Sequence, residues 1–402
     1  MIKNKFIQIK YFEIFLIVFG IFLDRYFELA TLLFVNFSII FRKSNFFISK
    51  KLLLFLLYVS IISFFSNFFI HQNYNKLIQQ LILVSIFSIC YGIFFIEHSG
   101  NINIIFDFYL KFSIFISFLG ILQFIIFYFF NFDIFDFMYE KPVSKIRNNL
   151  IRINSIMREP SNLSTIITPA FTYYFFKKKS IPETITLLLL LVTILFTFSA
   201  ITYLVIALLI IYKIYTNRNI YIKFFFTIFF VFALLVFINV MYVYNNFTIG
   251  VNPITDILIK LSQTFMSFFC ITPEVFESLN LSTYAILSNL YVALESPFRL
   301  FGTGIGSHEL NYNLVYISDF NYYGLNSTDA YSCFIRIFSE FGIIGIIIML
   351  IFFIRHFNKK SLINLSALSI LFTLIIRGGH YVLYGTIFFV YLYLYSSKRK
   401  LK

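Results

Sequence analysis

The residues best suited to chemistry in this 402-residue chain are basic side chains gathered where a polar segment meets an apolar one. Segment 152–165 reads RINSIMREPSNLST, with Arg152, Arg158 and Glu159 directly before an apolar run. Pro160 suits the first turn of a helix, where its missing N–H costs no hydrogen bond. A helix N-terminus beside two arginines attracts anions, and guanidinium groups bind phosphate oxygens in pairs. The segment therefore predicts an anion site; the alternative is that Arg158 and Glu159 only pair with neighbours at a membrane interface.

A second segment, RLFGTGIGSHEL at 299–310, combines alternating glycines with Arg299 and His308. The glycines are Gly302, Gly304 and Gly306. No βαβ pattern surrounds them and no Lys-Ser/Thr pair follows, which argues against a nucleotide loop. We expect either a flexible turn or a backbone that approaches another part of the chain closely. His308 adds a group able to transfer protons near neutral pH.

Tyrosines and carboxylates follow this segment. They are Tyr312, Tyr316, Asp319, Tyr322, Tyr323, Asp329 and Tyr331. Aromatic faces with carboxylates suit sugar rings, which offer C–H faces and hydroxyl edges. The competing interpretation is an aromatic belt at a membrane interface, where Tyr is also common.

A third segment, IRGGHY at 376–381, contains Arg377 and His380 in the turn between the last two predicted spans. Ionisable groups near membrane depth indicate function by default, although an arginine also extends to the interface for solvation alone. Several cationic residues thus share the predicted outer side, namely Arg152, Arg158, Arg299, Arg336, Arg377, His308 and His380. Together they predict a site for a multiply charged phosphate ligand. If this ligand is a lipid diphosphate, the departing diphosphate needs cationic stabilisation, and a base must take the proton of the attacking hydroxyl.

No metal and no cofactor are predicted. The three cysteines, Cys90, Cys270 and Cys333, form no Cys-x-x-Cys pair and no cluster with histidine. No acidic triad stands together elsewhere in the chain.

The elements that must position these residues are apolar helices. Hydrophobic residues make up 60% of the chain and charged residues only 12%, and long apolar runs recur throughout. Runs of about eighteen or more apolar residues indicate membrane spans. The sequence therefore predicts an all-α polytopic integral membrane protein with about a dozen spans. They are expected at 7–23, 27–41, 52–70, 77–96, 108–130, 160–176, 183–198, 200–216, 221–243, 339–356, 362–376 and 380–396.

The formal charge of +14 fits short inner loops better than a nucleic-acid partner, because basic clusters favour the cytoplasmic side. With both termini inside, basic residues on the inner side outnumber those on the outer side about two to one. An even number of crossings then requires a hairpin near Ser199 within 183–216. We expect a single membrane domain over 1–402, with an outer loop at 131–159. A long outer loop at 244–338 is expected to hold short helices.

Several short motifs resemble those of a known family. The pattern from Arg152 to Ser161, R-x-x-S-I-M-R-E-P-S, resembles the Arg…Glu-Pro-Ser motif of Wzy-type O-antigen and capsule polymerases. The long outer loop contains G-x-G-x-G and closes on SCFIRIFSEFGIIG at 332–345, which is similar to the family's Glu-x-Gly-x-x-Gly junction. The Phe198-Ser199 pair resembles the family's short turn between spans. With the predicted dozen spans and cytoplasmic termini, the resemblance covers essentially the whole chain, and the order and spacing of the short motifs are its stronger part.

The resemblance implies a GT-C-like membrane glycosyltransferase that polymerises undecaprenyl-diphosphate-linked oligosaccharide repeat units into O-antigen or capsular polysaccharide. Donor and acceptor would both be lipid-linked, the bilayer would surround the enzyme, and a chain-length regulator would be a further partner. The site would face the periplasm from the bacterial inner membrane. Glu159, His308 and Arg158 are the expected catalytic residues. The expected substrate-binding residues are Arg152, Arg299, Arg336, Arg377, His380, Tyr331 and Asp329.

The chain departs from one related pattern. O-antigen ligases have the same layout and carry His-Asn about nine residues before the junction glutamate, where this chain has Tyr331 and Ser332 before Glu340. This difference favours the polymerase. The general base stays open among His308, His380, Glu159 and Asp329, with His308 and Glu159 ranked first. A ligase that transfers glycan to lipid A-core, a flippase and a structural membrane protein are the alternatives.

Overall fold

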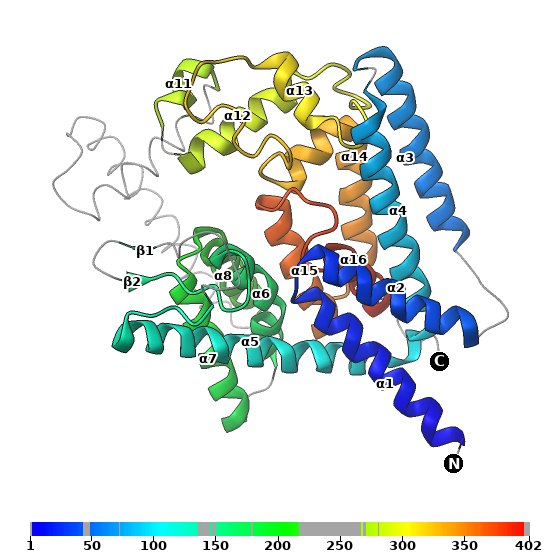
Figure 1. Ribbon diagram of the computed structural model, residues 1–402, viewed down its shortest axis with the longest axis vertical. Coiled ribbons are helices and arrows are strands. Elements are labelled where there is room, and N and C mark those ends of the chain that lie inside the picture. Colours follow the sequence, from blue (N-terminus) through cyan, green and yellow to red (C-terminus); the bar gives the residue numbers. More distant parts are fainter. Residues whose placement is uncertain are drawn as a thin grey trace. The chain divides into compact units, whose positions relative to one another are not determined.

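The computed structural model describes residues 2–42, 49–71, 73–135, 145–146, 150–177, 180–216, 267, 271–279 and 281–397, and the described chain is mainly helical (Figure 1). Its helices are α1 (Ile2–Ile21), α2 (Arg25–Arg42), α3 (Lys50–Phe69), α4 (Tyr74–Glu97), η1 (Ser99–Asn101), α5 (Ile102–Phe130), α6 (Pro160–Phe176), α7 (Ile181–Thr197), α8 (Ala200–Thr216), α11 (Pro273–Glu277), α12 (Leu281–Glu295), α13 (His308–Val315), α14 (Cys333–His356), α15 (Leu362–Ile376) and α16 (Thr386–Ser397). Two short strands, β1 (Lys145–Ile146) and β2 (Leu150–Ile151), pair antiparallel.

Four helical stretches in the described residues are long and apolar enough to cross a membrane. They are Leu52–Phe69, Tyr74–Glu97, Ser99–Phe130 and Cys333–His356. Shorter apolar helices lie at Ile181–Thr197, Ile201–Thr216, Leu362–Ile376 and Thr386–Ser397. Only 17% of the apolar stretch of α14 is buried within the protein, which suits a helix that faces lipid tails. The chain is therefore a helical membrane protein, as its composition predicts.

The predicted spans that fall on described residues all overlap helices, and the span at 221–243 lies outside the described residues. Four helix starts differ from the prediction by five or six residues. Helices α1, α5 and α14 begin earlier, at Ile2, Ile102 and Cys333 rather than at 7, 108 and 339. Helix α16 begins later, at Thr386 rather than at 380, because Gly378, Tyr384 and Gly385 in the preceding loop have positive φ and interrupt a helix.

Local signals set the boundaries of α7. Ser180 and Glu183 form a capping box at its N-terminus, and Pro182 lies in the first turn. The helix ends where Phe198 adopts a left-handed φ of 49°, and α8 begins at once at Ala200. The segment 183–216 is thus two helices with a turn near Ser199, as predicted.

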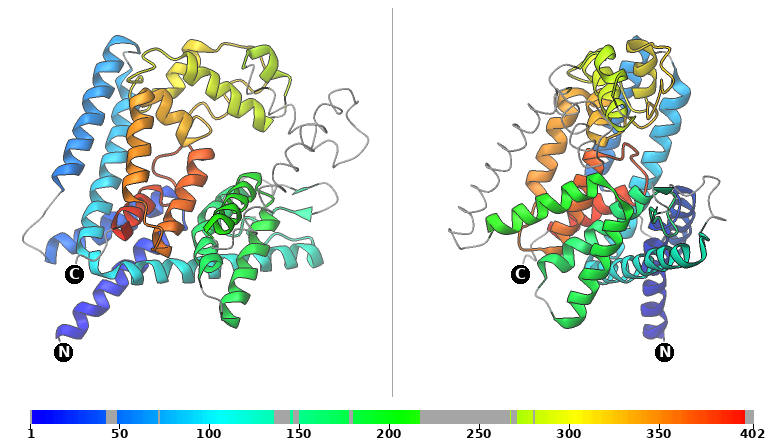
Figure 2. Two further views of the ribbon diagram at one scale, coloured as in Figure 1. Left: turned by 180° about the vertical axis from the view of Figure 1, so that it is seen from behind. Right: turned by 90° about the vertical axis from the view of Figure 1, so that its left-hand side faces the viewer.

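The residue contacts divide the chain into two compact units, and each is described by itself. Unit 1 comprises 1–61, 75–206 and 347–402; unit 2 comprises 62–74 and 207–346. The single membrane domain expected from the sequence stays a prediction. In unit 1, α6 packs against α15, α7 and α5, and α15 packs against α16; Figures 1 and 2 show α6 and α7 in green beside α5 in cyan.

The core of unit 2 is aromatic. It contains Phe276, Tyr284, Leu287, Val292, Tyr312 and Tyr316, contributed by α11, α12, α13 and the residue after α13. These helices fall inside the predicted outer loop at 244–338, of which 244–266, 268–270 and 280 lie outside the described residues. The short helices expected in this loop are present in its described part.

Two carboxylates inside predicted spans are buried and paired. Glu13 of α1 forms an ion pair with Arg42 of α2, and its other oxygen lies 3.3 Å from Nε2 of His98. Glu28 of α2 accepts a hydrogen bond from the Tyr91 hydroxyl at 2.5 Å. The interior of the spans is therefore more polar than the sequence suggested.

Candidate functional site

A buried amide fixes the segment that carries Arg152 and Arg158. Gln123 of α5 is fully buried, and its Oε1 accepts hydrogen bonds from the backbone N–H groups of Asn154 at 3.1 Å and Ser155 at 2.8 Å. Its Nε2 donates to Oδ1 of Asp133 at 2.9 Å and to Oδ1 of Asn154 at 2.7 Å. A buried, fully bonded amide holds one backbone conformation firmly. Segment 152–157 is therefore fixed to α5 within unit 1.

Arg152 is half-buried and anchored to the C-terminus of α7. Its Nε donates to the carbonyl of Thr197 at 3.0 Å, and its Nη2 donates to the carbonyl of Phe198 at 3.4 Å. These carbonyls form the negative end of the helix dipole. Burial and then the charge of Arg377 lower the pKa of Arg152, and the Glu159 carboxylate acts in the opposite direction. Arg377 and Glu159 therefore both lie within electrostatic reach of Arg152 in unit 1.

Helix α6 begins directly after Glu159, which is its N-cap residue in an extended conformation. Pro160 occupies the first turn, as the sequence predicts. Arg158 and Glu159 are exposed, and the Ser161 hydroxyl donates to Oε2 of Glu159 at 3.2 Å. Since this carboxylate is exposed, it can meet a substrate hydroxyl. The N-terminus of a 17-residue helix and two arginines thus lie in one region of unit 1.

The loop at 377–385 contributes Arg377 and His380, both partly buried. Arg377 is the C-cap residue of α15, and its N–H donates to the carbonyl of Thr373 at 2.8 Å. Across the loop, Nδ2 of Asn162 in α6 donates to the Tyr384 hydroxyl at 2.7 Å. This hydrogen bond joins the loop directly to the first turn of α6.

The glycine-rich segment of unit 2 supplies hydrogen-bond partners to the backbone of α14 where that helix is interrupted. Gly342 in α14 has φ 62° and ψ −160°, which interrupts the helical hydrogen bonds there. The N–H groups of Ile343 and Ile344 donate instead to the carbonyls of Arg299 and Leu300, at 3.0 and 3.2 Å. In return, the carbonyls of Ser339 and Glu340 accept from the N–H groups of Thr303 and Gly304, at 3.2 and 2.8 Å.

Close backbone approach explains two of the glycines, Gly302 and Gly304. A Cβ on Gly302 would overlap the backbone of Glu340 and Phe341, and a Cβ on Gly304 would lie 2.7 Å from Cα of Ser63. Of the two sequence interpretations, close backbone approach is the one that holds. The segment is a packing element.

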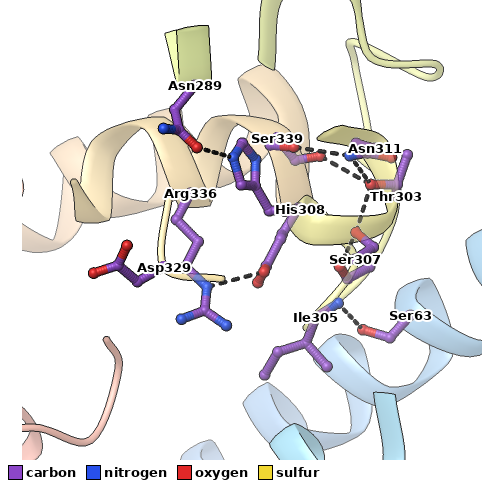
Figure 3. A network of polar contacts seen from close by, with 12 residues as sticks. Ser63, Asn289, Thr303, Ile305, Ser307, His308, Asn311, Asp329, Arg336 and Ser339 are labelled. Atoms are coloured by element: carbon purple, nitrogen blue, oxygen red, sulfur yellow. Dashed lines mark hydrogen bonds and ion pairs between the residues drawn. The ribbon is translucent and has the colours of Figure 1, made fainter. Parts of the chain in front are cut away.

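His308 begins α13 and is almost completely buried, at 1% exposure (Figure 3). Its Nε2 lies 2.9 Å from Oδ1 of Asn289, so Nε2 carries the proton, and Nδ1 has no hydrogen-bond partner among the described residues. Burial, followed by the charge of Arg336, lowers the pKa of His308 to about 3. A general base acts best with a pKa near the working pH. The catalytic role of His308 stays a prediction, and its surroundings favour another residue as base.

Arg336 and Glu340 form a buried ion pair in α14. Nε of Arg336 lies 2.9 Å from Oε1 of Glu340, and their side chains are 2% and 0% exposed. Figure 3 also shows Asn311, whose Nδ2 donates to Oγ1 of Thr303 at 2.7 Å and to Oγ of Ser339 at 2.8 Å. Asn311 therefore joins α13 to the glycine-rich segment and to α14.

The other expected binding residues of unit 2 differ in exposure. Arg299 is exposed and pairs with Glu295 at 3.1 Å. Tyr331 is mostly buried, and its N–H donates to Oδ1 of Asp329 at 3.2 Å. Of the aromatic candidates, Tyr312 and Tyr316 belong to the buried core, whereas Tyr322 and Tyr323 are exposed. Only the exposed pair is available to a sugar ring.

The structure therefore brings some predicted residues together and leaves others separate. Arg152, Arg158, Glu159, Arg377 and His380 belong to unit 1. The members in unit 2 are Arg299, His308, Asp329, Tyr331 and Arg336. Sequence reasoning missed Gln123, Asn162 and Tyr384. Gln123 offered one signal, because it is a polar residue inside a long apolar run.

Comparison with models of known protein families, with curated proteins and with solved structures found no match.

Proposed function

We propose that this protein polymerises undecaprenyl-diphosphate-linked oligosaccharide repeat units into O-antigen or capsular polysaccharide. The observation that carries the proposal is the position of Arg152. It is held half-buried on α7 carbonyls, within electrostatic reach of Arg377 and Glu159, beside the start of α6. Two guanidinium groups and a helix N-terminus are suited to a diphosphate.

In the proposed reaction, a hydroxyl of the acceptor sugar attacks the anomeric carbon of the donor. The C–O bond to the diphosphate breaks, and the electron pair leaves with undecaprenyl diphosphate. Arg152, Arg377 and Arg158 stabilise the charge on the leaving group. Glu159 is the proposed base, because its exposed carboxylate can reach a substrate hydroxyl and take its proton.

The rest of the assignment also belongs to the proposal. We place about a dozen spans in the bacterial inner membrane, with both termini in the cytoplasm and the arginine site at the periplasmic face. The lipid-linked donor and acceptor, the bilayer and a chain-length regulator are the partners; nucleic acid is not.

A flippase for the same lipid-linked unit is the second candidate, and the break in α14 favours it. Broken apolar helices beside buried charges are typical of transporters, and here the break at Gly342 lies next to the Arg336–Glu340 pair. A ligase would use the same donor site with lipid A-core as acceptor.

Gel analysis of surface glycan from cells that lack the protein distinguishes the three. Single repeat units on their final acceptor would support the polymerase. Long lipid-linked chains without surface glycan would point to a ligase, and single lipid-linked units retained inside would point to a flippase.

Arg158→Ala gives a sharper test in cells that make the protein. Because Arg158 is exposed, we expect normal membrane insertion together with loss of polymer, at least about a hundredfold. Full-length polymer from this variant would exclude Arg158 from the site. The amount of protein in the membrane fraction is the control for insertion.

A further inference from the structure

The loop at 377–385 is held in place by contacts at both ends. At its start, Arg377 caps α15, and α15 packs along α6 with Oγ1 of Thr172 donating to Oγ of Ser369 at 2.9 Å. At its end, the N–H of Gly385 donates to Oε2 of Glu28 at 3.3 Å. Glu28 is buried, at 1% exposure, so this contact anchors the loop to the interior of unit 1.

The loop end is also conformationally constrained. Tyr384 has φ 49° and Gly385 has φ 69°, so two consecutive residues adopt left-handed backbone conformations. A bulky residue rarely adopts this conformation unless its surroundings enforce it. A Cβ on Gly385 would lie 2.5 Å from the Ile21 side chain, which leaves this backbone no room to shift.

The side chain of Tyr384 links this constrained end to α6. Its hydroxyl accepts a hydrogen bond from Nδ2 of Asn162 at 2.7 Å. Asn162 lies in the first turn of α6, three residues after the N-cap Glu159. The bond therefore crosses from the loop that carries Arg377 to the helix end that carries the proposed base.

We infer that Tyr384 is a positioning residue of the anion site, whose phenol holds the 377–385 loop, and with it Arg377, against the first turn of α6. The inference rests on the proposed function, because it assumes that a diphosphate binds between these elements. Tyr384 need not touch the ligand. It fixes the separation between Arg377 and the pair formed by Arg152 and Glu159.

The test is calorimetric binding of inorganic diphosphate to the full chain purified in detergent, with a thermal unfolding curve for each variant. Tyr384→Phe removes the hydroxyl and keeps the ring. We expect it to weaken binding about tenfold without lowering the unfolding temperature. Tyr391→Phe is the matched control, because it removes a phenol that donates to the carbonyl of Ser88 at 2.8 Å in the same unit. The control should bind as the wild type does.

Asn162→Ala supplies the second arm. It should weaken diphosphate binding as much as Tyr384→Phe does. The double variant should lose no more affinity than either single variant, because all three lack the same hydrogen bond between Asn162 and Tyr384. Losses that multiply, or wild-type binding by Tyr384→Phe, would overturn the inference.

The Arg152→Ala variant distinguishes failure of the positioning role of Tyr384 from failure of the proposed anion site. If it loses binding while Tyr384→Phe binds normally, the positioning role alone is wrong. If the wild type does not bind diphosphate, the anion site is absent, and the inference and the proposed function fall together.

Discussion

Arg152 is held by backbone carbonyls rather than by a carboxylate, so its positive charge stays available to an anion. Its guanidinium is anchored by the Thr197 and Phe198 carbonyls, which hold the side chain in place without cancelling its charge. A carboxylate partner in the same place would neutralise it. This anchoring favours binding of an external anion over a structural ion pair.

The replacement Arg152→Gln keeps a donor for the α7 carbonyls and removes the charge. We expect the affinity for diphosphate to fall about tenfold or more, with little change in stability. Arg25→Gln is the matched control: Arg25 is partly exposed in unit 1, and its guanidinium lies over the ring of Tyr26. Equal binding by both variants would show that Arg152 does not contact the anion.

The lowered pKa of buried His308 predicts that the stability of the folded chain depends on pH. Its pKa is lowered in the folded chain from 6.5 to about 3, so the unfolded chain binds the proton more tightly. Its contribution is complete above about pH 6.5 and is lost as the pH falls toward 3. The loss amounts to about 2 kcal/mol at pH 5.

The His308→Asn variant should therefore show a smaller fall in unfolding temperature between pH 7 and pH 5 than the wild type. His356→Asn, whose ring lies 3.3 Å from Oγ of Ser397, is the control and should retain the wild-type slope. A His308→Asn slope equal to that of the wild type would mean that His308 is already accessible to protons.

At the scale of elements, the apolar runs predicted where helices would lie. The expected spans on described residues all overlap helices, four of which are long and apolar enough to cross a membrane, and the turn near Ser199 was located from the charge distribution. What the runs could not predict is the interruption of α14 at Gly342, because it depends on a loop that begins at Arg299, far away in the sequence. The delayed start of α16 has a similar cause, since Glu28 of α2 and Asn162 of α6 hold the preceding loop.

The candidate site was predictable to a similar degree. Residue type and spacing indicated Arg152, Arg158 and Glu159 at a helix start, and the structure places that start at Pro160. The partners that orient them were not predictable, because Gln123 and Tyr384 act through contacts with sequence-distant residues. Local pattern carries no information about such contacts.

Gly342→Ala tests the exchange of hydrogen bonds between α14 and the glycine-rich segment. Gly342 has φ 62°, and an added Cβ would overlap the backbone of Leu300 and Arg299. We expect a loss of more than about 2 kcal/mol of stability. Gly100→Ala is the control, because nothing lies within 4 Å of its added Cβ. Equal unfolding temperatures for the two variants would contradict this geometry.

At the scale of the whole molecule, the proposal requires the described part of the 244–338 loop to lie outside and the α14–α15 turn to lie inside. Cysteine labelling tests this in a variant in which Cys90, Cys270 and Cys333 are replaced. A membrane-impermeant maleimide should label Ile317→Cys in intact cells and Lys359→Cys only after lysis, since both positions are exposed. The reverse pattern would invert the topology and remove the site from the periplasmic face.

The most direct measurement is a reconstituted polymerisation. The purified full chain, placed in lipid vesicles with an undecaprenyl-diphosphate-linked oligosaccharide, should yield a ladder of lipid-linked chains and release one undecaprenyl diphosphate for each bond formed. Arg152→Gln should yield neither. A wild-type protein that produces no chain longer than the starting unit, under conditions in which it binds that unit, would contradict the proposed polymerase.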